Sequence, residues 1–583
     1  MRVRFLILLF FAISVLTSCK TEENIPIPNA SVNPDSEFAA FTDNLFKNEV
    51  CSDSLTLNYT LSHPENYNIP SHTGNLLPEG FTSFTYEDLE SHSLELENTL
   101  ATLKNFNQKK FSRQQLILYD ILSDTLQTQL EGQNYLAFTE SLGPTTGIQA
   151  QLPVLLAEFR MEDETDLSQY FSLLRTTPDY FTSLLDLEVR KKELGTLPCR
   201  STLSHIINQC ERYLEENGTS VLESTFENKI KNCSFLDAEA REKATRRNRR
   251  LVRKKIIPAY KELMAGLVDL LPFAGTDGAL CRYNRGDSYY TYLIRSVTGS
   301  FRTPDELREL LTSRLESAEQ TLISYAAKDP ALFGSCQNYA AKFTSPEQIL
   351  STLKTAAAAD FPSCENTNYS VKYVDEALED YLSPAFYLTP PLDDSENNVI
   401  YINGADRYDP SSLFNTLAHE GYPGHLLQTC YMQNQDLPLL RYILDYGGFT
   451  EGWASYAEIY SYKYTGGSEG EVQILQNNMI AALCLYGLAD IGVHKDGWNS
   501  DDLYQFMKAY GTWEKDAVTQ LYEAIIDEPA SYLKYAVGYL EFTLLKDKFR
   551  EIDGANYTDK RFHTYILDMG NAPFDVLEKY MGN

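Results

Sequence analysis

The sequence contains no cysteine pair at C-x-x-C spacing, which excludes the common zinc sites built from thiolates. Its ten cysteines are scattered along the chain. Positive charge is also scarce. The sequence has 50 Lys and Arg against 81 Asp and Glu, which gives a formal net charge of -31. Nucleic acids and anionic lipid surfaces are bound through positive charge, so we expect neither as a partner.

The sequence beyond residue 38 also lacks the features that divide a chain into small units. It has no stretch rich in Pro, Gly or Ser, no internal repeat and no low-complexity tract. A run of about 545 residues without such a break exceeds the usual size of one domain, yet nothing marks a boundary. We therefore expect one large, continuous body.

The first residues are arranged as a bacterial lipoprotein signal. Arg2 and Arg4 precede an apolar run that begins at Phe5 and is too short to span a membrane. The letters "LTSC" that follow, residues 16–19, resemble the lipobox, whose cysteine becomes the lipidated first residue of the mature protein. We expect residues 1–18 to be a signal peptide and Cys19 to anchor an exported lipoprotein to the periplasmic or extracellular face of a membrane. A plain secretory signal cut elsewhere is the alternative.

Residues 19–37 are polar and contain prolines, which predicts a flexible tether. Residues 38–370 are predicted to be a mainly helical region, because apolar residues recur three and four positions apart. Thr303 and Glu306 are spaced as a helix-starting capping box. The basic run at residues 241–255 lacks interleaved aromatic residues, so we interpret it as a solvated helix face.

Residues 371–583 are predicted to form the catalytic region. Within it "NVIYIN", residues 398–403, alternates β-branched and aromatic residues and predicts a strand shortly before the helix that carries His419. The expected fold is therefore mainly α, with a small β-sheet beside the active site. The same strand is expected to hold a peptide by backbone pairing.

The segment "HEGYPGH", residues 419–425, contains a His-Glu pair and a second histidine. On a regular helix His419 and His425 would point about 240° apart and could not share a metal ion. Pro423 and Gly424 lie between them, and they favour a break, since proline removes a backbone donor and glycine allows a tight turn. We predict a bend that brings the two imidazoles together. A chance cluster of histidines is the alternative.

A third metal ligand is expected from "FTEGWASYAEIY", residues 449–460. Glu451 and Glu458 are seven positions apart and share a helix face, which suits Glu451 as a ligand and Glu458 as a group that orients a histidine. A solvated acidic face is the alternative, but the apolar neighbours indicate a buried helix, where unpaired carboxylates are costly. One Zn²⁺ with three protein ligands fits this set. Glu420 is then the predicted general base that takes the proton of a water at the metal and passes it to the leaving amine.

Two further segments are predicted to assist catalysis at the zinc site. Asp490 and His494 are four positions apart, so Asp490 is expected to hold the ring of His494 towards the active site. Tyr535 is expected to donate its phenol to negative charge that develops on the substrate, with Tyr532 and Tyr539 as alternatives.

Four segments, "HEGYPGHLLQ", "TEGWASYAE", "DIGVHKDGW" and "PASYLKYAVG", occur in this order and resemble the bacterial domain-of-unknown-function family 885. The resemblance is specific over about residues 387–538. Members of that family resemble helical zincin-like metallopeptidases, so the resemblance implies a zincin-like fold. It also implies the same site residues: His419, His425 and Glu451 as zinc ligands, and Glu420 as the base. Ser531 departs from the family pattern, in which many members have Gln.

The function predicted from the sequence is zinc-dependent hydrolysis of peptide bonds, in short peptides or at chain ends, by a cell-envelope lipoprotein. A metal-dependent amidase acting on cell-wall peptides is one alternative. A non-catalytic lipoprotein that binds a solute or peptide is the other, although a pure binder has no need of Glu420 beside the metal. Arg282, Arg285 and Arg295 could supply a positive group for the C-terminal carboxylate of a peptide.

Overall fold

The computed structural model describes residues 34–69, 80–215, 220–336, 343, 345–364, 368–374, 379, 383–405 and 413–582. The predicted signal peptide and Cys19 lie outside these residues. Helix α1 (Pro34–Val50) begins inside the predicted tether, so residues 34–37 belong to a helix and the tether prediction was too long at its C-terminal end.

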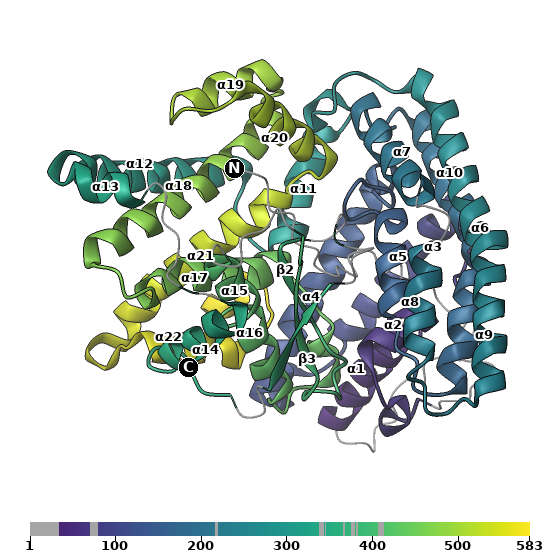
Figure 1. Cartoon of the computed structure of the whole chain (residues 1–583). Coiled ribbons are helices and arrows are strands. Elements are labelled where there is room, and N and C mark those ends of the chain that lie inside the picture. Colours follow the sequence, from purple (N-terminus) through teal and green to yellow (C-terminus); the bar gives the residue numbers. More distant parts are fainter. Residues whose placement is uncertain are drawn as a thin grey trace.

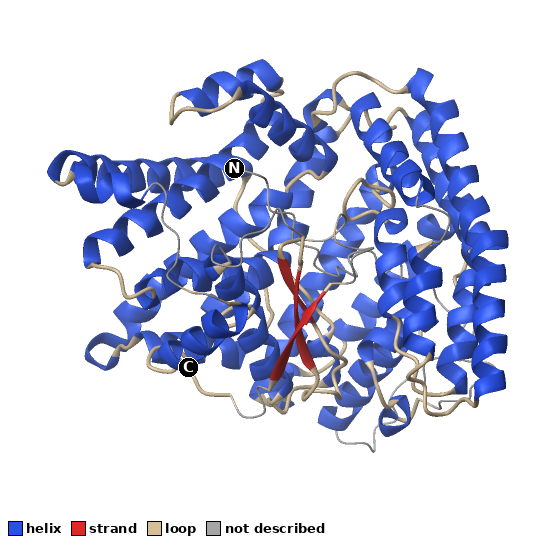
Figure 2. Ribbon diagram, in the orientation of Figure 1, coloured by secondary structure: helices blue, strands red, loops and turns tan. Residues whose placement is uncertain are grey.

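The described chain is mainly helical, as predicted, with one small sheet (Figure 2). The helices before the sheet are α1, α2 (Ser54–Thr60), α3 (Tyr86–Lys104), α4 (Arg113–Gly132), α5 (Ile148–Glu158), α6 (Glu164–Leu194), α7 (Arg200–Glu215), α8 (Val221–Ile230), α9 (Ala238–Leu251), α10 (Ile257–Leu270), α11 (Gly286–Thr298), α12 (Pro304–Lys328), α13 (Pro330–Cys336) and α14 (Pro346–Ala357). Those after it are α15 (Phe414–Glu420), α16 (His425–Gln433), α17 (Gly447–Ser461), α18 (Glu469–His494), α19 (Ser500–Lys508), α20 (Lys515–Asp527), α21 (Ser531–Asp553), α22 (Asp559–Met569) and α23 (Phe574–Lys579).

Local signals in the sequence fix where several helices begin. The Thr303 side chain accepts a hydrogen bond from the Glu306 amide, and the Glu306 carboxylate accepts one from the Thr303 amide at 2.8 Å. The predicted capping box is therefore confirmed, and α12 begins directly after it. The Ser112 side chain caps α4 with Gln115 in the same way.

The sheet contains three strands in the order β1-β3-β2. Strand β3 (Asn398–Ile402) confirms the strand predicted at "NVIYIN". It pairs in parallel with β1 (Tyr369–Tyr373) and antiparallel with β2 (Ala385–Leu388). The prediction that a peptide pairs with β3 is wrong, because both edges of this central strand already carry backbone partners.

The sheet lies between two groups of helices, with α5 to α10 on one side and α14 to α18, α21 and α22 on the other (Figure 1). Ile400 and Ile402 belong to the apolar core that surrounds α15 to α21. Phe386 and Tyr401 stack at a ring distance of 5.0 Å and face the core of α5 to α10. Because side chains alternate across a strand, one short sheet joins both cores.

Helix α18 is the described helix that is long and apolar enough to cross a membrane, by length and composition only. It packs against α12 and α21 inside the protein. Its apolar residues are thus used as those of a core helix.

Candidate metal centre

The chain breaks between α15 and α16, at the position that the Pro-Gly pair predicts. The Gly424 amide donates to the Ala418 carbonyl at 3.0 Å, and a Cβ at Gly424 would lie 1.8 Å from the carbonyl oxygen of His419. Only glycine fits this close approach of backbone to backbone. The turn places the ring centroids of His419 and His425 4.8 Å apart.

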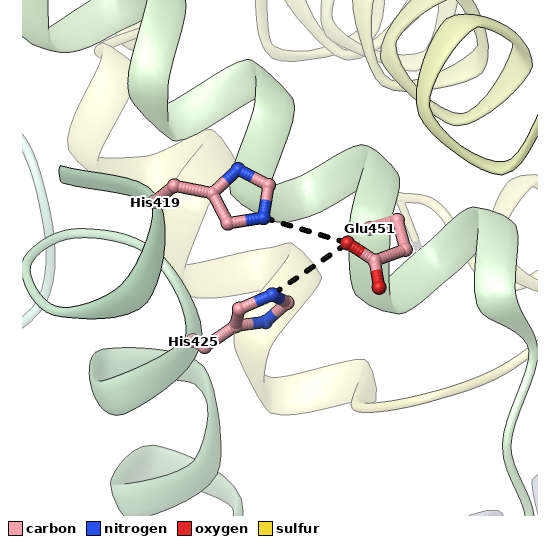
Figure 3. A group of neighbouring side chains, drawn as sticks. All are labelled: His419, His425 and Glu451. Atoms are coloured by element: carbon pink, nitrogen blue, oxygen red, sulfur yellow. Dashed lines mark ion pairs between the residues drawn. The ribbon is translucent and has the colours of Figure 1, made fainter. Parts of the chain in front are cut away.

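Three predicted ligand side chains converge at this turn (Figure 3). One carboxylate oxygen of Glu451, on α17, lies 3.4 Å from His419 Nε2 and 3.7 Å from His425 Nε2. One ligand atom from each residue lies within 4.8 Å of the others. Two imidazoles and a carboxylate from three different helices therefore face one point.

The three side chains are buried, and the atoms that face one another make no hydrogen bond within the described chain. His419 and His425 are each 3 % exposed and Glu451 is 0 % exposed. Both Nε2 atoms and both carboxylate oxygens of Glu451 lack a hydrogen-bond partner in the part of the chain that the structure describes. Buried polar atoms are normally satisfied, so this cluster suits a bound cation.

Glu458 lies seven residues after Glu451, on the same face of α17. Its carboxylate is 3.3 Å from His419 Nδ1. Burial alone would lower the pKa of His419, but the carboxylates of Glu451 and Glu458 outweigh it and raise that pKa to about 10. Burial alone would raise the pKa of Glu451, and the two imidazoles instead lower it to about 2. Glu458 therefore lies against the Nδ1 side of the His419 ring, while Nε2 points towards Glu451; this is the position that the predicted orienting role requires.

Glu420 ends α15 beside strand β2. Its Oε2 accepts a hydrogen bond from the Tyr387 amide at 3.0 Å, and its Oε1 is buried without a partner among the described residues. Burial raises the pKa of Glu420, because the charged form is poorly solvated there. The sheet therefore holds one oxygen of Glu420 and leaves the other available.

Comparisons with known proteins place the chain in a family. The family model described as "Bacterial protein of unknown function (DUF885)" matches residues 79–581. The chain belongs to this family. A search of curated proteins gave no match.

Two solved structures have the fold of this DUF885 protein. A crystal structure of a candidate lipoprotein from Colwellia psychrerythraea is 18% identical, with a TM-score of 0.79, and the match covers 94% of this chain and 98% of that one. A structure of a candidate lipoprotein of unknown function from Shewanella oneidensis is 15% identical, with a TM-score of 0.67, and the match covers 95% and 100% of the two chains. At these identities the likeness establishes the fold alone.

Tyr535 of the DUF885 chain lies close to the cluster, on α21, with its ring centroid 6.3 Å from that of His419. Glycines bring the two helices together, because a Cβ at Gly452 of α17 would lie 2.4 Å from the Cα of Gly538. Burial raises the pKa of Tyr535, and the carboxylates of Glu451 and Glu420 raise it further. The phenol therefore keeps its proton. Of the alternatives, Tyr539 accepts a hydrogen bond from Arg314 at 3.0 Å.

The predicted contact between Asp490 and His494 is wrong. The Leu280 amide donates to His494 Nδ1 at 3.3 Å, and His494 Nε2 lies 2.9 Å from the Ile525 carbonyl. His494 is 0 % exposed, and burial lowers its pKa to about 4, so it is a neutral core residue. Asp490 instead accepts hydrogen bonds from the Tyr290 hydroxyl at 2.5 Å and from the Ala530 amide at 3.1 Å. It thereby anchors the start of α21, the helix that carries Tyr535.

The arginines considered for a substrate carboxylate have other partners. Arg295 pairs with Asp124 at 2.9 Å and with Glu131 at 3.5 Å. Arg282 pairs with Asp277 at 3.1 Å. The Arg285 guanidinium donates to the Asn134 carbonyl at 3.1 Å. The three guanidinium groups therefore interact with other residues of the protein and are not free to bind a substrate carboxylate.

Sequence reasoning missed three contacts that build the site. They are the Tyr387 amide on Glu420, the Trp453 indole on the Pro423 carbonyl at 3.1 Å, and the glycine contact between α17 and α21. The second and third have a signal in the sequence, because tryptophan and small residues flank Glu451 in "TEGWAS".

Proposed function

We propose that this protein is a zinc-dependent peptidase with a zincin-like catalytic region, and that it acts on short peptides or chain ends. The observation that supports this most strongly is a set of buried atoms that make no hydrogen bond among the described residues: both Nε2 atoms of the histidines, the Glu451 carboxylate oxygens and Oε1 of Glu420. Leaving so many polar atoms unsatisfied is costly unless an ion and a water complete them.

The donor set fits zinc. Two imidazole nitrogens and one carboxylate are a donor set that catalytic zinc sites use, with a position left open. Calcium and magnesium prefer oxygen ligands throughout, so the two histidines disfavour them. Residues His419, His425 and Glu451 would hold the ion, and bound zinc would supply Lewis acidity that polarises a peptide carbonyl and acidifies water.

The residues around the donor set have separate tasks. Oε1 of Glu420 accepts a proton from water and delivers it to the leaving amine, while the Tyr387 amide fixes the other carboxylate oxygen. The raised pKa of Glu420 makes its carboxylate a stronger base than a solvated one, which suits a group that takes a proton from water. Tyr535 donates its phenol proton in a hydrogen bond to the oxygen that gains charge. Glu458 keeps the His419 ring in place.

We also propose that the protein works as a lipoprotein of the bacterial cell envelope, anchored through Cys19. The arrangement of residues 1–19 supports this location, and both similar solved structures are described as candidate lipoproteins.

The test is a pair of glutamate variants assayed with a mixed peptide library. We expect the wild-type protein to bind about one zinc per chain, and Glu420→Gln to keep the zinc while cleavage of the library stops. Glu469→Gln, the same change at an exposed position on α18, is the matched control and should cleave as the wild type does.

Mass spectrometry of digests made with free and end-blocked peptides identifies the bonds that are cut. A zinc-loaded wild type that cleaves no peptide would overturn the proposed activity and favour the non-catalytic binding alternative. Cleavage that survives Glu420→Gln would remove Glu420 from its proposed role.

A further inference from the structure

Asp445 presents a fixed and exposed carboxylate beside the metal centre. It precedes α17, the helix of Glu451, and its side chain is exposed to solvent. The Thr450 hydroxyl donates to Asp445 Oδ1 at 2.6 Å, and the Asn571 amide group donates to the same oxygen. Asn571 also accepts the Tyr446 amide at 3.0 Å. The carboxylate is therefore held from both sides through one oxygen.

The other carboxylate oxygen of Asp445, Oδ2, is not held by hydrogen bonds in this way. In the described part of the chain, Oδ2 accepts no hydrogen bond, although the side chain cannot rotate without breaking the bonds to Oδ1. A surface carboxylate is usually mobile, and fixing it costs side-chain entropy. A carboxylate that is fixed but has one oxygen unused is organised in advance to bind a donor.

The position relates Asp445 to the proposed reaction. Thr450, which holds Asp445, is the residue before the proposed ligand Glu451. Lys534, which precedes Tyr535 on α21, packs its aliphatic stem against Gly447, where a Cβ would lie 2.9 Å from Lys534 Cδ. Asp445 thus lies where α17 and α21 meet, at the end that carries Glu451 and Tyr535.

We propose that Asp445 Oδ2 binds an ammonium group of the peptide substrate and so determines which substrates are used. This inference rests on the proposed peptidase function. An ammonium donor beside a fixed carboxylate makes a charge-assisted hydrogen bond, which is stronger and shorter than a neutral one. Although Asp445 is open to solvent, desolvation by the protein around it and the nearby Glu451 carboxylate raise its pKa, and the Lys534 ammonium acts in the opposite direction. A further cation beside Asp445 would likewise stabilise the ionised form. The arginines that were candidates for a substrate carboxylate are paired elsewhere, which favours recognition of the amine end.

Two parts of a peptide can supply an ammonium group: the free N-terminus and a lysine side chain. The experiment therefore uses one peptide in four forms, with the N-terminus free or acetylated and with one lysine free or Nε-acetylated. For the wild type we expect a higher kcat/KM for the form with the free group that Asp445 binds. The pair of peptides that shows the difference identifies the source of the ammonium.

The variant is Asp445→Asn. Its amide oxygen can still accept from Thr450 and Asn571, so the change removes the charge and turns the presented oxygen into a donor. Hydrogen bonds to charged groups contribute about 1.5 to 3 kcal/mol, so we expect the preference for the free ammonium to fall by about 10- to 100-fold. Asp501→Asn, on the exposed pair with Lys515, is the matched control and should keep the preference. Zinc content and thermal unfolding of each variant check that the protein is folded and loaded.

A second measurement does not depend on turnover. Calorimetry with the zinc-loaded Glu420→Gln protein compares binding of the free and acetylated peptides, with and without Asp445→Asn. A preference for the free ammonium that disappears with Asp445→Asn supports the inference even if no peptide is cleaved. Equal binding and equal kcat/KM for all four peptides in a cleaving wild type would overturn the inference and leave the proposed peptidase function intact.

Discussion

Glu458 offers a quantitative test of how the site is built, because it touches a proposed ligand and not the metal position. Its carboxylate lies 3.3 Å from His419 Nδ1 and is 5 % exposed, so it holds the ring from the side opposite Glu451. Groups that orient a metal-binding histidine typically contribute a factor of about 10 to 100 in metal affinity. The test therefore compares two separate variants, in which Glu458 is replaced by Gln or by Ala.

Glu458→Gln keeps an oxygen that can accept the Nδ1 proton but removes the negative charge that makes His419 a better donor. We expect zinc affinity to fall about tenfold, or about 1.4 kcal/mol. Glu458→Ala removes the contact and leaves the ring free to turn, so the fall should reach about 100-fold, or about 2.8 kcal/mol.

The assay is a competition titration of zinc between the protein and a chromogenic chelator. Glu469→Gln serves as the control for loss of one negative charge on a neighbouring helix. Zinc affinities of both Glu458 variants that equal that of the wild type would refute the reasoning that this carboxylate positions His419.

Three other predictions follow from the same structure. Tyr535→Phe should lower kcat by about 100-fold or more and leave zinc affinity unchanged, measured by steady-state kinetics and the same titration, because in the proposed mechanism the phenol acts on charge that forms during the reaction. His494 has its pKa lowered to about 4, so as the pH falls from 6.5 to 4 the unfolded chain binds a proton before the folded chain does. The wild type should lose up to about 3 kcal/mol of unfolding free energy across this window, and His494→Gln should lose less without a change in zinc affinity, as urea unfolding at several pH values would reveal. Gly452→Ala should destabilise the protein by about 1 to 3 kcal/mol in thermal unfolding, because its Cβ would lie 2.4 Å from the Gly538 Cα, whereas Gly334→Ala, with open space around the new Cβ, should not.

The convergence of His419 and His425 could be predicted from the sequence because its cause is local. Proline and glycine restrict or free the backbone within the five residues that separate the two histidines, and the close approach at Gly424 is a backbone contact. The shared direction of Glu451 and Glu458 could be predicted for the same reason, since two positions seven apart lie on one face of a single helix.

The contacts that the sequence did not predict depend on packing between distant segments. A spacing of four places Asp490 and His494 on one face of α18, but it does not say which neighbours that face meets. Their partners are Tyr290, Ala530, Leu280 and Ile525, from other elements. The pattern of "NVIYIN" likewise predicts a strand without its place in a sheet, and the pairing with β1 and β2 closed both of its edges.

The central claim is that His419, His425 and Glu451 hold one zinc ion. Anomalous diffraction at the zinc edge, from crystals grown with one equivalent of zinc, tests it most directly. We predict a single strong peak about 2.1 Å from both Nε2 atoms and from a carboxylate oxygen of Glu451. Crystals that bind zinc elsewhere, or that leave these three side chains without a peak, would contradict the account.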